Sequence, residues 1–156
     1  MTYERFEDLP VWKAAISLAE RIYALTERAP FKRKYSLRDQ IERAALSVSN
    51  NIAEGFERGT TQELLTFLYI ARGSAGEVRS MLCFLERLPA FEDLKSEIIN
   101  LKSEVEGISR QLRAWADSLQ NTEIKGQRYL SEKDRSISRH KKEKAEFLDM
   151  LKSYKK

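Results

Sequence analysis

The chain has little cysteine, histidine, proline or glycine for its 156 residues. The single cysteine, Cys83, excludes an intrachain disulfide, and we expect it to be a buried small hydrophobic residue. The single histidine, His140, has no second metal ligand beside it, so no zinc site is predicted. With 3 prolines and 6 glycines, the composition is typical of helical bundles and unlike that of all-β or disordered chains.

Long apolar runs and catalytic motifs are also missing. No stretch approaches the roughly 18 apolar residues of a membrane span, and the N-terminus lacks the features of a signal peptide, so a cytoplasmic protein without membrane contact is expected. We find no nucleophile motif, no phosphate loop, no metal-ligand spacing and no pair of carboxylates in an identifiable cleft. The sequence therefore predicts a protein that is not an enzyme and uses no cofactor or metal.

Positive charge is concentrated at the C-terminus. The formal net charge is +4, but residues 1–121 hold 17 basic against 18 acidic residues, whereas residues 122–156 hold 11 against 6. Any general attraction to nucleic acid should therefore come first from the C-terminal segment, with local patches contributing from the body. The sequence thus divides into a domain at 1–121 and a basic extension at 122–156.

Four segments of the domain have apolar residues at the three- and four-residue spacing of amphipathic helices. The first begins at Pro10, with Asp8 as its expected cap. Ser36 is expected to cap the second, whose end is marked by Gly55 or Gly59. Four such helices joined by short connections predict an all-α, up-down-up-down four-helix bundle, followed by a basic helical extension.

The third predicted helix carries a capping box, because Glu63 follows Thr60 by three residues. Inside this helix Gly73 and Gly76 each cost about 1 kcal/mol relative to alanine. We expect the close approach of another backbone to offset that cost, with a ligand-facing groove as the alternative. The fourth helix, from about Phe91, has the apolar period of a coiled-coil seam. Its members are Leu94, Ile98, Leu101, Val105, Ile108, Leu112, Trp115 and Leu119.

A polar track runs beside the apolar residues of the second helix. Its candidate functional members, which we call the polar seam, are Arg43, Ser47, Asn51, Glu54 and Arg58. Serine and asparagine are weak helix formers in a helix interior, so such a track needs either a compensating contact or a tolerant, exposed site. The seam is therefore either a solvated or locally bonded face, or an interface with a subunit or ligand.

Two basic segments are candidates for phosphate contact. One is the connection after Pro30, from Ala29 to Tyr35, and the other lies in the extension. The residues predicted to contact nucleic acid are Arg33, Lys34, Arg139, Lys141, Lys142 and Lys144. The alternative for both segments is that their charges are simply solvated.

Two blocks, Asn51-Ile-Ala-Glu-Gly55 and Ile70-Ala-Arg-Gly-Ser74, lie within a pattern that spans about residues 6–119. This pattern resembles the four-helix-bundle proteins encoded in intervening sequences of bacterial large-subunit ribosomal RNA. The resemblance implies a homopentamer without chemical activity, in which the polar seam is a candidate for the subunit interface or for lining the assembled ring. These proteins are similar to the accessory variability determinant proteins of retroelements, which partner a reverse transcriptase and its RNA.

Two functions follow from these patterns. The first is an oligomeric module that associates with RNA or DNA through basic surface and tail residues, where several copies would strengthen weak phosphate contacts. The alternative is a scaffold or accessory protein that binds a protein partner such as a reverse transcriptase.

Overall fold

The computed structural model describes residues 3–121, which form four α-helices and no strand. Three short 3-10 helices, at Phe6–Asp8, Ala29–Phe31 and Pro89–Leu94, lie before or between them. The α-helices are α1 (Pro10–Thr26), α2 (Tyr35–Glu57), α3 (Thr61–Leu85) and α4 (Lys95–Gln120). The predicted all-α class and the four helices are confirmed, and the extension at 122–156 lies outside the described residues.

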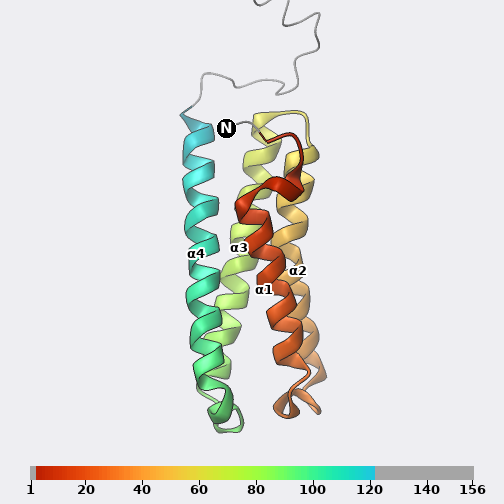
Figure 1. The fold of residues 1–156 in the computed structure, drawn as a ribbon, viewed down its shortest axis with the longest axis vertical. Coiled ribbons are helices and arrows are strands. Elements are labelled where there is room, and N and C mark those ends of the chain that lie inside the picture. Colours follow the sequence, from red (N-terminus) through yellow and green to blue (C-terminus); the bar gives the residue numbers. More distant parts are fainter. Residues whose placement is uncertain (1–2, 122–156) are drawn as a thin grey trace, which may run out of the picture. The chain divides into compact units, whose positions relative to one another are not determined.

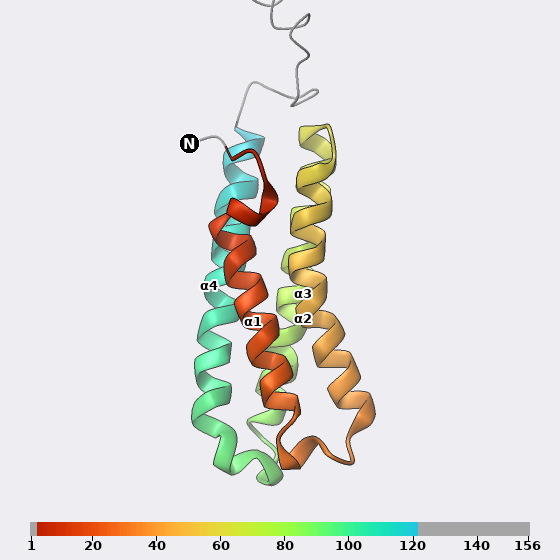
Figure 2. The ribbon, with the colours of Figure 1, turned by 45° about the vertical axis from the view of Figure 1, so that its right-hand side comes forward.

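Each helix packs against the helices that precede and follow it in the chain, and α4 also packs against α1. In Figure 1 the ribbon descends along α1, rises along α2, descends along α3 and rises along α4. Figure 2 shows the same arrangement after a turn of 45°. In both views the connection from α1 to α2 lies at the same end of the bundle as the connection from α3 to α4.

The apolar faces of the four helices meet in one core. Leu18 and Ile22 of α1, Ile41 and Ile52 of α2, and Leu82 of α3 are all fully buried. The predicted seam of α4 is buried from Leu94 to Leu112, while Trp115 and Leu119 are only partly buried. The heptad spacing therefore places six of its eight members in the core, as a bundle helix requires.

The close helix approach occurs at Gly55 and not at the two glycines of α3. A Cβ atom added to Gly55 would lie 2.7 Å from Cβ of Phe67 and 3.2 Å from Cδ1 of Leu64, so only glycine lets α2 and α3 pack this closely here. Gly73 and Gly76 are exposed, and an added Cβ would meet nothing within 4 Å. The expectation that another backbone approaches α3 closely at these two glycines is therefore wrong for the described residues.

The capping box of α3 and the start of α1 at Pro10 are confirmed, whereas the predicted caps of α1 and α2 are wrong. The Thr60 hydroxyl accepts a hydrogen bond from the Glu63 amide at 3.2 Å. Asp8 lies in a 3-10 helix and Leu9 occupies the cap position of α1, while α2 starts at Tyr35, one residue before Ser36. α2 ends at Glu57 with Arg58 as its C-cap in an extended conformation, so Gly59, which directly follows the cap, marks the end as expected, and Gly55 lies inside the helix.

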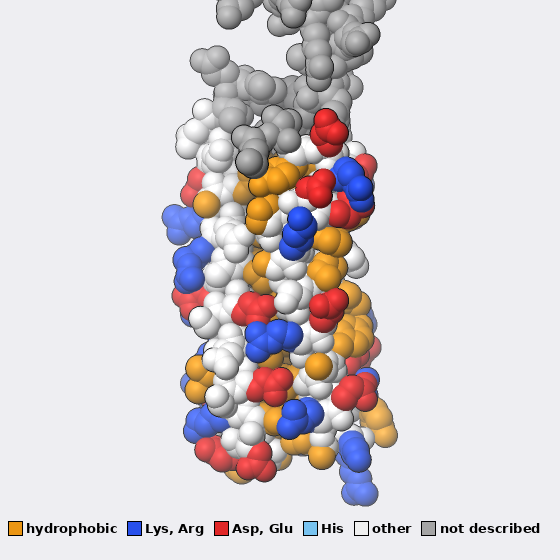
Figure 3. Space-filling view, viewed as in Figure 1, with side chains coloured by type: hydrophobic (Ala, Val, Ile, Leu, Met, Phe, Trp, Pro, Cys, Tyr) orange, Lys and Arg blue, Asp and Glu red, His pale blue; other side chains and the backbone are white. Residues whose placement is uncertain are grey.

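Charges of both signs are interspersed on the bundle surface, as one face shows in Figure 3. Ion pairs join α1 to α4 through Arg21 and Glu104 and α3 to α4 through Arg79 and Glu106, and Lys102 of α4 pairs with Glu86, the C-cap of α3. The hydrogen bond from Lys102 lowers the pKa of Glu86. The expectation of a fully buried Cys83 is wrong: it is half-buried and lines an open hollow with Ser80, Phe84 and Arg87. In the described part of the chain, no helix is both long enough and apolar enough to cross a bilayer.

Candidate functional site

The centre of the polar seam is bonded within the chain. The hydroxyls of Ser47 on α2 and Ser74 on α3 lie 2.8 Å apart and share a hydrogen bond. The Asn51 side-chain amide donates to the Ser47 carbonyl at 2.7 Å and to the Ser47 hydroxyl at 3.0 Å. Ser49 is fully buried and donates to the Leu46 carbonyl at 3.1 Å. These bonds compensate for weak helix formers in the interior of α2, so part of the seam holds α2 against α3.

The charged members of the seam remain at the surface. Arg43 has a side chain that is 80% exposed, and its guanidinium lies 3.5 Å from Asp39 one turn earlier. Arg58 donates to Glu54 at 2.7 Å, which raises the pKa of the Arg58 guanidinium, and it also lies over the Phe67 ring. Exposed pairs of this kind contribute little to stability, so these charges can exchange partners at low cost.

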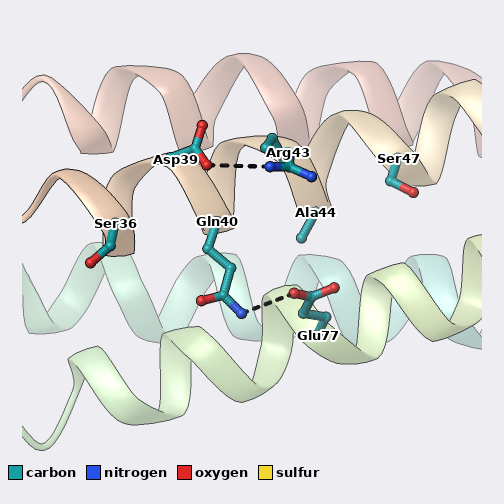
Figure 4. Close-up of a pocket in the computed structure, with 7 residues that line it drawn as sticks. All are labelled: Ser36, Asp39, Gln40, Arg43, Ala44, Ser47 and Glu77. Carbon is teal, nitrogen blue, oxygen red and sulfur yellow. Dashed lines mark hydrogen bonds and ion pairs between the residues drawn. The ribbon is translucent and has the colours of Figure 1, made fainter.

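An open groove of about 600 Å³ lies beside the seam, between α2 and α3. It is lined by Ser36, Asp39, Gln40, Arg43, Ala44, Ser47 and Glu77. Six of these residues belong to α2 and Glu77 belongs to α3. The Gln40 side-chain amide donates to the Glu77 carboxylate at 3.2 Å, and Figure 4 shows this bond running from one helix to the other. The groove offers donors, acceptors and charges of both signs, which suits a polar surface of another macromolecule. A second, more apolar hollow of about 760 Å³ involves Pro10, Phe56 and Trp115.

The basic connection between α1 and α2 is a tight, anchored turn. The Phe31 ring is 1% exposed and meets the Phe91 ring edge-on at 4.9 Å, which joins this connection to the one between α3 and α4. The Lys32 amide donates to the Ala29 carbonyl at 3.1 Å, and the Lys34 amide donates to the Phe31 carbonyl at 2.9 Å. The backbone that carries the cations is therefore fixed before any ligand binds.

The cations of this connection are not neutralised by neighbours. Most lysines and arginines among residues 3–121 form an ion pair with a carboxylate. Those without such a pair in that range are Lys13, Lys32, Arg33, Lys34, Arg72 and Arg87. Lys32, Arg33 and Lys34 are consecutive and exposed. Within the described bundle, they form the one run of adjacent cations without ion pairs.

Comparison with known proteins adds a family to this geometry. The model of the family described as 23S rRNA-intervening sequence protein matches residues 7–114. This range covers α1, α2 and α3 in full and α4 up to residue 114. The chain belongs to the 23S rRNA-intervening sequence protein family. A search of curated proteins found no match.

The predicted site residues of this chain that lie on the described bundle form two separate groups. Arg33 and Lys34 lie in the connection before α2, and the seam runs from Arg43 to Arg58 along that helix. The other predicted phosphate contacts, Arg139, Lys141, Lys142 and Lys144, lie outside the described residues. No cluster of three or more metal-ligating side chains occurs among residues 3–121.

Tyr35 is a further candidate functional residue, and it is one that the sequence patterns did not single out. It is the first residue of α2 and is 76% exposed. The signal was present in the sequence, because an aromatic residue directly follows three cations. Its exposure was not predictable, since the apolar spacing of α2 does not reveal where the helix begins.

Proposed function

We propose that the protein is a non-enzymatic, oligomeric four-helix bundle that associates with nucleic acid through its basic connection and its C-terminal extension. The observation that carries this proposal is the anchored run Lys32–Lys34, three exposed cations without an ion pair in the described bundle. Free cations on a rigid backbone release counterions from phosphates without first breaking internal ion pairs. The family name also links its members to an intervening sequence of 23S rRNA.

The full chain with Arg33→Gln and Lys34→Gln is expected to bind structured RNA and duplex DNA more weakly, with a smaller dependence on salt. Because each phosphate contact contributes roughly 0.9 to the slope of log affinity against log salt for a duplex, the slope should fall by about 2 for each bound chain. Fluorescence anisotropy titrations at several salt concentrations measure this slope. Neutralising Arg139, Lys141, Lys142 and Lys144 together should lower it further.

The matched control is Arg110→Gln with Arg113→Gln, which removes the same charge from exposed arginines of α4. Both arginines already pair with a carboxylate one turn away, so this variant should keep the parent slope. An equal loss in the two variants would mean that only net charge matters. Unchanged binding in the Arg33 and Lys34 variant would favour a scaffold that binds a protein partner.

The proposed oligomer is a homopentamer of up-down-up-down bundles, the assembly that the family resemblance implies, with the exposed seam residues Arg43, Glu54 and Arg58 at the interface. Light scattering should give a mass five times the 18.2 kDa of one chain. Arg43→Glu should lower that mass, whereas Arg110→Glu should not, although each arginine pairs with an acid one turn earlier. A monomeric mass for the parent chain would contradict the assembly.

A further inference from the structure

Tyr35 is unusually exposed for a large side chain in this bundle. The other exposed large hydrophobic residues among residues 3–121 range from 39% to 52%, whereas Tyr35 reaches 76%. Tyr69, by comparison, accepts a hydrogen bond from Gln120 through its hydroxyl at 2.6 Å. Within the described bundle, Tyr35 has neither an aromatic contact nor a side-chain hydrogen bond. About three quarters of the surface of Tyr35 is therefore open to a ligand.

The neighbours of Tyr35 define the chemistry of that ligand. Lys32, Arg33 and Lys34 precede it without interruption, so an aromatic ring and three cations without ion pairs lie within four residues. Cations bind the phosphates of any nucleic acid, but an aromatic ring contributes only where a base is free to stack on it. In a regular duplex the bases are already stacked on one another. The combination therefore selects a strand with unpaired bases.

The anchoring of the connection strengthens this selection. Phe31 is held in the core against Phe91, and the turn that follows is closed by backbone hydrogen bonds up to Lys34. The Arg38 amide then donates to the Lys34 carbonyl at 3.0 Å, which continues directly into α2. The backbone at Tyr35 is consequently ordered together with that of the cations, so less entropy is lost when a strand binds both.

Resting on the proposed function, we infer that the connection is a binding site for single-stranded nucleic acid. An unpaired base stacks on the Tyr35 ring while Arg33 and Lys34 contact the adjacent phosphates. The site takes any base, because every base has a face that can stack. The partner is therefore an unpaired segment, such as a loop or a strand end, and not the paired part of a structured RNA.

The test compares the full chain with Tyr35→Ala and Tyr35→Phe, using short oligouridylate, oligothymidylate and a duplex of matched length as probes. Tyr35→Ala should weaken binding of the single strands about 5- to 100-fold and change duplex binding by less than about twofold. Tyr35→Phe should bind like the parent, because the ring is retained. The salt dependence should stay the same in both variants, since stacking releases no counterions.

Tyr69→Ala is the control, since it removes an exposed tyrosine from another helix and should leave all binding unchanged. Binding of either single strand, RNA or DNA, supports the site if it depends on the Tyr35 ring. If Arg33→Gln with Lys34→Gln weakens binding but Tyr35→Ala does not, the single-strand inference is wrong and the proposed function stands. If binding occurs but neither variant changes it, the connection is not a nucleic-acid site and the inference is wrong. If no probe binds, the proposed function is wrong as well.

Discussion

Replacing Phe31 with alanine is expected to lower the free energy of unfolding by about 3–5 kcal/mol, the usual cost of removing a buried aromatic side chain. Phe31 is 1% exposed, and its ring meets that of Phe91 at 4.9 Å with an angle of 78° between the planes. Truncation would leave a cavity at the end of the core and remove this edge-on contact. Truncation of Phe91, which is equally buried and makes the other half of this contact, should cost a similar amount.

Urea unfolding at a fixed protein concentration measures this change, because the stability of an oligomer depends on concentration. Tyr35→Ala is the matched control, since it removes a second aromatic ring only four residues away. Its 76% exposure predicts a change within about 0.5 kcal/mol. A loss below about 1 kcal/mol for Phe31→Ala would show that the basic connection is not anchored by the core.

Gly55→Ala is expected to lower the free energy of unfolding by about 1–3 kcal/mol, although alanine is the better helix former. The new methyl group would lie 2.7 Å from Cβ of Phe67, an atom that cannot move without the backbone of α3. It would also lie 3.2 Å from Cδ1 of Leu64 and 3.4 Å from the Leu64 carbonyl oxygen. The two helices would have to move apart along their whole contact.

For Gly73→Ala on the neighbouring helix α3, we expect the opposite change in the free energy of unfolding. An added Cβ there meets nothing within 4 Å, so the substitution should raise the free energy of unfolding by up to about 1 kcal/mol through helix propensity alone. Thermal unfolding of both variants at the same concentration tests the pair. A stabilising Gly55→Ala would contradict the close packing of α2 and α3.

The features that sequence predicted well depend on spacing along one helix. The apolar period from Leu94 to Leu112 matches the buried face of α4, and the Thr60 capping box forms between residues three apart. Such patterns need no knowledge of neighbouring helices. The cap of α2 is Lys34 and not Ser36, two residues earlier than predicted, because the turn anchored by the contact of Phe31 with Phe91 leads directly into the helix.

The errors concern contacts between helices that are distant in sequence. The close approach was expected at Gly73 and Gly76 but occurs at Gly55, because which glycine faces a neighbour depends on how α2 and α3 are packed. The polar pattern along α2 likewise could not show that the Ser47 hydroxyl forms a hydrogen bond with the Ser74 hydroxyl on α3. The sequence identified Arg33 and Lys34 as candidates, yet their lack of ion pairs became visible only when the carboxylates of all four helices were placed.

The most direct test of the central claim is the salt dependence of RNA binding by the full chain, with and without Arg33→Gln and Lys34→Gln. We expect binding that weakens steeply as salt rises, and a slope that falls by about 2 per bound chain in the double variant but not in the Arg110→Gln and Arg113→Gln control. No binding at low salt, or the same slope in all three proteins, would contradict the assignment of the basic connection as a nucleic-acid site.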